Sequence, residues 1–450
     1  VGSRPRPAVQ FMNKDNDGYW AAWSPDGIHV TDSPLNPVFT GGSDVGQFTW
    51  DPHTQRFLGY VKNNSYVNDL RRRSVALTTT TDIETWPAEE LILEVDSYDD
   101  RWVPSGTVQR THLYGLSAFP YESMYMGFLW IFRATDVDGY YLGPVFAEIV
   151  SSHDGITWTR EEGTRLAMLP LGPAGAWDDG QLYTARAPVL DGDTLKIYYG
   201  ACDKEHGTAL NQTTCAIGLA TLRKDGFASL DAGATPGTVT TKGLAWASGA
   251  LRVNCTASAG WLKAEVLDDS GNVVPGYGLA ACNPVQGNGV DQVVTWVDRV
   301  ELPTDVAPIR IRFTLQNASL YSFAVGDGAR IIQPPTITRH PTDQTTLPGG
   351  SASFSVRATG SWPLSFQWQK NGVDLAEGGH FAGTTTMTLR LAGIGTGDAG
   401  TYACRVMNPF GEVVSGGAVL HIRVASFAGV GIAPGGTAST VSGITADGSV

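Results

Sequence analysis

The sequence predicts an all-β protein built from about three separately folded parts. Its 450 residues exceed what one hydrophobic core normally holds. Glycine is frequent, at 54 residues, and charged residues make up only 17% of the chain. No stretch shows an amphipathic helical pattern three turns long. Together, these features favour many short strands joined by tight turns.

A recurring Ser/Thr-x-Asp turn predicts the architecture of the first half. The turn occurs at Ser24-Pro25-Asp26, Thr80-Thr81-Asp82 and Ser152-His153-Asp154, and a weaker copy at Arg223-Lys224-Asp225. The copies lie 56, 72 and 71 residues apart. A period of this length predicts the four-stranded blades of a β-propeller with long loops.

Three blades and half of another are expected before residue 232. Their strands are predicted at 45–50, 57–62 and 74–80, then 113–119, 124–132 and 145–152, then 181–190, 195–201 and 216–222. The half blade lies near 11–30, and further blade sequence is expected upstream of Val1. Residues 1–232 are therefore predicted to form an incomplete five-bladed β-propeller, truncated at its N-terminus, in a fragment of a larger secreted protein.

The second half predicts two sandwiches and a tail. Alternation at period two, as in 251–255 and 309–315, predicts a β-sandwich over 233–330. Residues 333–424 resemble an immunoglobulin-like domain, because Trp368 lies in a predicted strand and Tyr402 comes two residues before Cys404. Val356 stands where the partner cysteine is expected, so Cys404 should be buried and unpaired. Residues 425–450 are predicted to be a linker or the start of a repeat resembling the HAF type.

Charge and cysteine usage narrow the function classes. The formal charge of -13 makes nucleic acid a poor partner, and no apolar run is long enough to span a membrane. Cys202 with Cys215, and Cys255 with Cys282, are each either a disulfide or two free buried thiols; disulfides would indicate an extracellular or cell-surface protein. No metal or other cofactor is predicted, and the sequence does not indicate an oligomeric state.

Candidate site residues follow from where propellers carry function. The central funnel is lined by the starts of inner strands and by the loops on the same face. The strand starts carry Asp44, His112, Tyr114, Asp178 and Asp179. The predicted loops on that face add Asn63, Asn64, Arg71, Arg133, Asp136, Asp203 and His206. Each candidate also has a structural interpretation, as a turn cap, a loop residue or part of a strand edge.

Residues 1 to about 232 resemble the five-bladed propellers of glycoside hydrolase families 32 and 43. The segment 43–51 is similar to the family 32 stretch in which Arg-Asp-Pro precedes a strand and a Trp-Asp turn, although Ser43 and Val45 replace the arginine and proline. The resemblance implies that Asp44 orients the sugar. It also implies an acid glutamate at the start of the next inner strand, where 111–114 carries no carboxylate, and a nucleophile upstream of Val1.

Two functions are compatible with these residues. The first is a secreted glycoside hydrolase acting on a poly- or oligosaccharide, with Asp44 and either Asp178 or Asp179 as the carboxyl pair that cleavage needs. A histidine at 112 or 206 is an alternative acid. The residues expected to bind substrate are Arg71, His112, Tyr114, Arg133 and His206. The alternative is a non-catalytic glycan-binding or adhesion protein, favoured by the missing glutamate; a surface array protein is a weaker third possibility.

Overall fold

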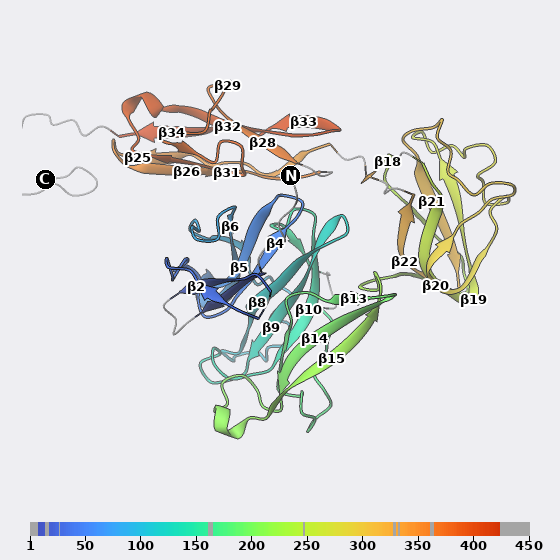
Figure 1. Cartoon of the computed structure of the whole chain (residues 1–450), viewed down its shortest axis with the longest axis horizontal. Helices are drawn as coiled ribbons and strands as arrows, with labels where there is room; N and C mark the ends of the chain where they lie inside the picture. Colours follow the sequence, from blue (N-terminus) through green and yellow to red (C-terminus); the bar gives the residue numbers. More distant parts are fainter. Residues whose placement is uncertain are drawn as a thin grey trace, which may run out of the picture. The chain divides into compact units, whose positions relative to one another are not determined.

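The computed structural model describes residues 8–13, 18–26, 28–160, 165–245, 248–326, 330–331, 334–360 and 364–423 (Figure 1). The chain divides into two structural units, Val1–Arg330 and Ile331–Val450. Within the described ranges, the only helical elements are two three-residue 3-10 turns, Leu210–Gln212 and Thr396–Asp398. The all-β prediction is therefore confirmed. The predicted linker or repeat at 425–450 lies outside the described residues.

The first unit begins with a three-stranded and a four-stranded antiparallel sheet. The three-stranded sheet contains β1 (Ala8–Asn13), β2 (Tyr19–Ser24) and β3 (Thr31–Asp32). The four-stranded sheet, in the order β4-β5-β6-β7, contains β4 (Gly46–Asp51), β5 (Arg56–Val67), β6 (Leu70–Thr80) and β7 (Glu90–Leu93). Tyr19, Phe39 and Phe48 pack together with Val61 and Ala76, so one apolar cluster joins the two sheets.

The β5–β6 hairpin is longer than the sequence predicted. Asn68 and Asp69 both have positive φ, at 52° and 61°, as a two-residue type I′ turn requires. This turn keeps both chains in register almost to the tip, from Phe57↔Thr80 to Val67↔Leu70. Residues 63, 64 and 71, which were predicted to lie in loops, therefore lie on strands.

A larger sheet holds the strands of the predicted second and third blades. It contains β8 (Arg110–Tyr121), β9 (Met124–Ala134), β10 (Val145–Ser152), β11 (Trp158–Thr159), β12 (Gln181–Thr184), β13 (Val189–Asp191), β14 (Thr194–Cys202) and β15 (Cys215–Arg223). The main path runs β13-β14-β12-β10-β9-β8. One parallel pair, Val145↔Gln181, joins β10 to β12, so the two predicted blades share a single sheet. The predicted strand 181–190 is divided between β12 and β13, and Pro188, which has no N–H to donate, lies in the gap.

The repeated Asp turns have a common geometry in three of the four copies. The carboxylates of Asp26, Asp82 and Asp154 each accept a hydrogen bond from the backbone N–H two residues further on, which closes the turn. Asp225 differs, because its carboxylate accepts a hydrogen bond from the Tyr121 hydroxyl at 2.6 Å. The strands of residues 8–223 largely match the predicted ones, while their arrangement as propeller blades stays a prediction.

Residues 230–330 contribute a second set of sheets to the first unit. The six-stranded sheet contains β16 (Leu230–Ala232), β17 (Gly237–Thr240), β19 (Leu251–Leu267), β20 (Val285–Val293), β21 (Arg310–Gln316) and β22 (Ala318–Val325); β18 (Leu244–Ala245) pairs with β23 (Arg330–Ile331). Trp296 and Phe313 are central to its apolar core. Cys255 and Cys282 lie in this core as free thiols, so the alternative of a disulfide between them is wrong. By contrast, Cys202 and Cys215, paired across β14 and β15, form a disulfide.

The second unit is an immunoglobulin-like sandwich. Its strands are β24 (Thr336–Arg339), β25 (Gln344–Thr346), β26 (Ser351–Ser355), β27 (Arg357–Thr359), β28 (Ser365–Lys370), β29 (Val373–Asp374), β30 (Phe381–Ala382), β31 (Thr388–Ala392), β32 (Gly400–Asn408), β33 (Gly411–Val414) and β34 (Ala418–Ile422). Trp368 is fully buried opposite Cys404. The Tyr402 hydroxyl donates to the Asp398 carbonyl at 2.7 Å, which is the expected tyrosine corner. Cys404 is buried and unpaired, as predicted.

Candidate functional site

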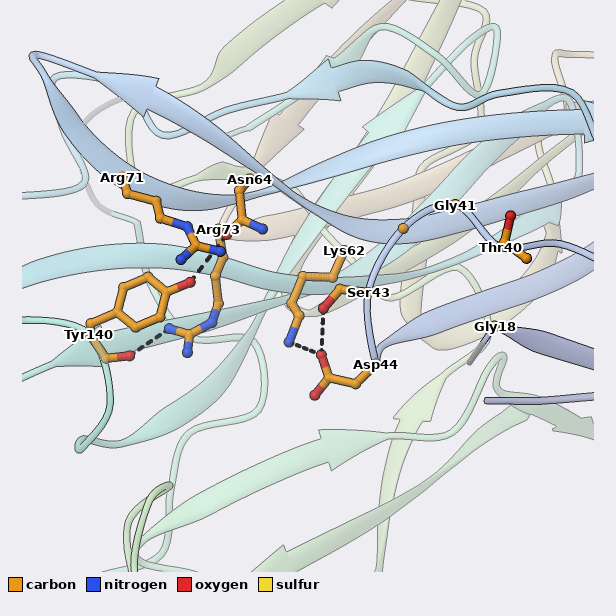
Figure 2. Close-up of a pocket in the computed structure, with 11 residues that line it drawn as sticks. Gly18, Thr40, Gly41, Ser43, Asp44, Lys62, Asn64, Arg71, Arg73 and Tyr140 are labelled. Carbon is orange, nitrogen blue, oxygen red and sulfur yellow. Dashed lines mark hydrogen bonds and ion pairs between the residues drawn. The ribbon is translucent and has the colours of Figure 1, made fainter. Parts of the chain in front are cut away.

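A polar cavity of about 430 Å³ opens where the β5–β6 hairpin meets the loop before β4 (Figure 2). Tyr140, from the loop between β9 and β10, completes it. The lining residues are Gly18, Thr40, Gly41, Gly42, Ser43, Asp44, Lys62, Asn64, Arg71, Arg73 and Tyr140. Three of these side chains are cations and one is a carboxylate, so charged groups from distant parts of the chain meet here.

Strand alternation places the cations on one face. Asn64 and Arg73 are directly paired across the hairpin, and Lys62 and Arg71 each lie two residues from one of them. Residues two apart on a strand share a face, so these four side chains point to the same side. Arg72 points to the opposite side, where it is buried and donates to the Asp100 carboxylate and the Thr111 carbonyl.

Glycines let the loop at 40–44 approach the hairpin closely. Gly42 has a φ of +72°, and a Cβ there would lie 2.8 Å from the Val61 Cβ. A Cβ on Gly41 would lie 2.5 Å from the Phe39 ring. Because a side chain fits at neither position without displacement, this wall of the cavity requires glycine.

Asp44 and Lys62 form an ion pair inside the cavity (Figure 2). The Lys62 side chain is only 7% exposed, whereas that of Asp44 is 47% exposed. The Ser43 hydroxyl also donates to Asp44 Oδ1, at 2.8 Å. Burial tends to raise the pKa of Asp44, but the hydrogen bond and charge of Lys62 outweigh it and lower the pKa. Asp44 is therefore held as a carboxylate and is poorly suited to donate a proton.

Arg73 is a buried cation surrounded by aromatic rings. Its guanidinium lies 4.1 Å from the centroid of the Tyr140 ring and 5.0 Å from that of Phe132. Its Nη1 donates to the Tyr140 carbonyl oxygen at 2.8 Å. Burial lowers the pKa of Arg73. These contacts hold the guanidinium without neutralising its charge.

Arg71 and Asn64 contact Tyr140 from the hairpin. The Arg71 guanidinium lies 5.2 Å from the centroid of the Tyr140 ring, and the Tyr140 hydroxyl donates to Asn64 Oδ1 at 3.2 Å. In Figure 2, Arg71 and Arg73 lie on two sides of Tyr140. Arg71 is exposed, so it forms part of the accessible rim of the cavity.

His112 is placed behind the cavity and has no exposed surface. Its Nδ1 accepts from the Arg73 backbone N–H at 3.0 Å, so its Nε2 carries the proton and donates to the Gly139 carbonyl at 3.0 Å. Burial lowers the pKa of His112 to about 3. The imidazole is neutral, and both of its nitrogens are occupied by hydrogen bonds with the backbone of Arg73 and Gly139.

Tyr114 and His206 form a second supporting pair. His206 Nδ1 donates to the Tyr141 carbonyl at 2.8 Å, so its Nε2 accepts from the Tyr114 hydroxyl at 2.9 Å. Burial lowers the pKa of His206 and raises that of Tyr114 to about 12. The Tyr114 ring also packs 4.6 Å from Lys62 Nζ. Neither residue lines the cavity, although Tyr114 supports two of its cations.

The remaining predicted site residues lie outside this cavity. Asp178 Oδ2 accepts from the Tyr199 hydroxyl at 3.1 Å, and Asp179 accepts from the Gly175 N–H within its own turn. Arg133 lines a separate cavity of about 220 Å³. The structure therefore does not bring either of these two aspartates together with Asp44 in one cavity.

The smaller cavity borders a buried ionic network. Arg160 donates to both oxygens of Asp99, at 2.7 Å each, and to Glu148 Oε2 at 2.8 Å. Burial raises the pKa of Glu148, although Arg160 opposes this shift. Because one guanidinium binds both carboxylates, this network is a structural link between β10, the end of β11 and the loop before β8.

Sequence reasoning missed three main residues of the larger cavity: Lys62, Arg73 and Tyr140. Two of them had a detectable signal. Cations at 62, 71 and 73 alternate around an Asn-Asp pair, which is typical of a hairpin with one charged face. Tyr140 had no such signal, since only the tertiary fold brings it to the hairpin. In the described part of the chain, no group of three or more His, Cys, Asp or Glu side chains is suited to a metal ion.

Comparison with known families matches residues 335–420 to the immunoglobulin I-set domain. Roundabout homolog 3 of Homo sapiens is 30% identical over 105 residues, which are 22% of this chain and 8% of that protein. Leucine-rich repeat and fibronectin type-III domain-containing protein 4 of Rattus norvegicus is 32% identical over 123 residues, which are 27% of this chain and 19% of that protein. The chain thus spans less than a fifth of the length of these relatives.

Solved structures give likenesses over a fifth of the chain. Titin M4 is 28% identical, with 20% of this chain and 98% of that chain covered and a TM-score of 0.19. Titin domain M7 is 30% identical; the match covers 21% of this chain and 98% of that chain, with a TM-score of 0.19. No functional conclusion follows from scores this low. None of the helical segments described here has the length and apolar character needed to cross a lipid bilayer. The family match identifies residues 335–420 as an immunoglobulin I-set domain.

Proposed function

We propose that this chain is a non-catalytic, extracellular adhesion protein that binds a glycan in the cavity beside Asp44. The observation that supports this most is the state of Asp44 itself. Among the described residues it is the one carboxylate that lines the cavity, and Lys62 holds it in an ion pair. Such a group orients a sugar by accepting hydroxyl hydrogen bonds, but it lacks the partner that hydrolysis requires.

The glycoside hydrolase alternative has weaker support. Cleavage of a glycosidic bond normally needs one protonated and one ionised carboxyl on either side of the bond. Asp178 and Asp179 have hydrogen-bond partners outside the Asp44 cavity. His112 and His206 both have lowered pKa values, and each uses both ring nitrogens in hydrogen bonds. A general acid is therefore the component that the hydrolase hypothesis lacks.

We also infer that residues 1–232 belong to a five-bladed propeller. The inference is supported by the repeated Asp turns and by the four-stranded antiparallel sheet β4–β7, which has the strand number of one blade. The proposed boundaries, 1–232, 233–330 and 333–424, are compatible with separate apolar clusters in the three segments. In a propeller, the inner end of β4 and the hairpin beside it would face the funnel.

Protein contacts are proposed for the I-set domain, which acts as a binder or a spacer. The relatives matched in sequence are named as a roundabout homolog and as a protein that contains leucine-rich repeats and fibronectin type-III domains. An extracellular or cell-surface location is supported by the Cys202–Cys215 disulfide, because disulfides persist in oxidising compartments.

The test measures binding and cleavage in the same samples. The chain is titrated against a glycan panel while soluble products are followed by chromatography. We expect binding without product, and weaker binding by Asp44→Asn. Asp191→Asn is the matched control, since Asp191 also pairs with a lysine but lies outside the cavity. Product that forms with the parent and disappears with Asp44→Asn would overturn the proposal in favour of a hydrolase.

A further inference from the structure

We propose that the cavity beside Asp44 selects an acidic sugar, one that carries a carboxylate or a sulfate ester. This inference rests on the proposed glycan binding and specifies its ligand class. It comes from the charges that line the cavity and from its two arginines, which have no ion-pair partner in the described part of the chain.

The cavity has more positive than negative charge. In the described part of the chain, Lys62, Arg71 and Arg73 line it together with one carboxylate, Asp44. Asp44 pairs with Lys62 and so neutralises one cation. The formal charge of the whole chain is -13, so this local excess is opposite in sign to the molecule as a whole. The two arginines remain to attract an anionic ligand.

Arg73 has the strongest requirement for such a ligand. The residue is 6% exposed, and within the described ranges neither it nor Arg71 has an ion-pair partner. Burial removes water from a cation, and this costs free energy unless nearby polar or anionic groups replace the lost water. The rings of Tyr114, Phe132 and Tyr140 offset part of this cost for Arg73 through cation–π contacts. An anionic group bound in the cavity would supply the missing counterion.

The type of cation favours a carboxylate or sulfate. A guanidinium presents a planar fork of N–H donors that matches two oxygens of one anion. Arg71 is exposed at the rim and rests against Tyr140, so its fork is accessible from solvent and partly ordered. In Figure 2 the Lys62 side chain ends at Asp44, and the Arg71 and Arg73 guanidinium groups lie beside Tyr140.

The remaining lining favours a sugar over a bare ion. A volume of about 430 Å³ lies in the range of about 300–1,000 Å³ that is usual for small-molecule sites. Thr40 and Ser43 contribute hydroxyl groups, and Asn64 contributes an amide. These groups exchange hydrogen bonds with sugar hydroxyls. The arginines would then bind the acidic substituent while the opposite wall binds the neutral part of the same unit.

The test uses matched oligosaccharides that differ in charge. The full chain is titrated by calorimetry with neutral, uronic and sulfated oligomers of glucan, galactan and mannan, and with sodium sulfate alone. We expect at least one acidic oligomer to bind about tenfold more tightly than its neutral counterpart, in line with a hydrogen bond to a charged group. Comparison of the uronic and sulfated series distinguishes the two anionic groups.

Arg71→Gln is the main variant, because Arg71 is exposed and its loss should not prevent folding. We expect it to weaken the binding of acidic oligomers about tenfold and so to remove their advantage over the neutral counterparts. Arg252→Gln, which removes an exposed arginine from β19, is the matched control and should change neither.

The outcomes separate this inference from the proposed function. Equal affinity for neutral and acidic oligomers would refute charge selection while leaving glycan binding intact. Sodium sulfate that binds as tightly as the sulfated oligomers would refute the sugar part of the inference. Failure to bind any member of a wider glycan panel would overturn the proposed function itself.

Discussion

Removal of Arg160 should strongly destabilise the first unit. Arg160 is 8% exposed, and its two partners, Asp99 and Glu148, are 6% and 4% exposed. Three hydrogen bonds of 2.7, 2.7 and 2.8 Å connect them. In Arg160→Met the volume is roughly kept, but two buried carboxylates lose their shared cation. Breaking a buried pair in this way costs about 3–5 kcal/mol.

Arg252→Met is the matched comparison. Arg252 and Asp291 are 43% and 65% exposed at their side chains, so their ion pair is screened by water. An exposed pair of this kind contributes about 0–1 kcal/mol. Arg160→Met should therefore lower the free energy of unfolding by at least about 2 kcal/mol more than Arg252→Met does. Each variant removes one arginine charge, so a difference of this size comes from burial.

Urea denaturation of the full chain measures both variants, with tryptophan fluorescence as the signal. The transition that Arg160→Met shifts is assigned to the first unit, which contains Arg160. The loss should shrink at low pH, since protonation of Glu148 removes one of the two carboxylate charges that Arg160 balances. A stability change below 1 kcal/mol in Arg160→Met would refute the view that this network is a required structural link.

Two further predictions concern pH and redox state. The folded pKa of His112, about 3, lies below its unfolded value, so its contribution is present above about pH 6.5 and is lost as pH falls. Unfolding of the first unit should therefore become easier by about 2 kcal/mol between pH 7 and 5, and His112→Gln should remove this dependence; an unchanged slope in the variant contradicts the assignment. The Cys202–Cys215 disulfide closes a loop with a sequence separation of 13, so dithiothreitol should lower stability by about 3 kcal/mol. The double variant Cys202→Ser/Cys215→Ser should be insensitive to the reductant, and a further decrease on reduction would contradict this explanation.

The immunoglobulin-like unit could be predicted in detail because its signals are local. Trp368, Tyr402 and Cys404 lie in recognisable strand and corner positions, and their packing depends on neighbours within the same sandwich. Most strands between residues 45 and 223 were also predicted at nearly the right place, since alternation and Asp turns are properties of short segments. How those strands assemble into sheets depended on contacts such as Val145↔Gln181, which no local pattern contains.

The cysteines show what the sequence leaves open and what the tertiary structure decides. The sequence left both possible disulfides open. Cys202 and Cys215 are opposite each other on adjacent strands, where their sulfurs can meet. Cys255 and Cys282 are buried in the same core but remain free. The choice between bond and thiol therefore depended on geometry that only the folded sheets supply.

The candidate site depended most on tertiary structure. From the sequence alone, Asp44 was predicted at the start of a strand, and Asn64 and Arg71 in loops on the same face; the structure puts Asn64 and Arg71 on the β5–β6 hairpin beside Asp44. The sequence did not determine that Tyr140 would reach the same hairpin, or that Asp178 would lie elsewhere. A site assembled from loops and strands far apart in the chain is decided by long-range packing, because only packing sets the distance between groups that local sequence does not connect.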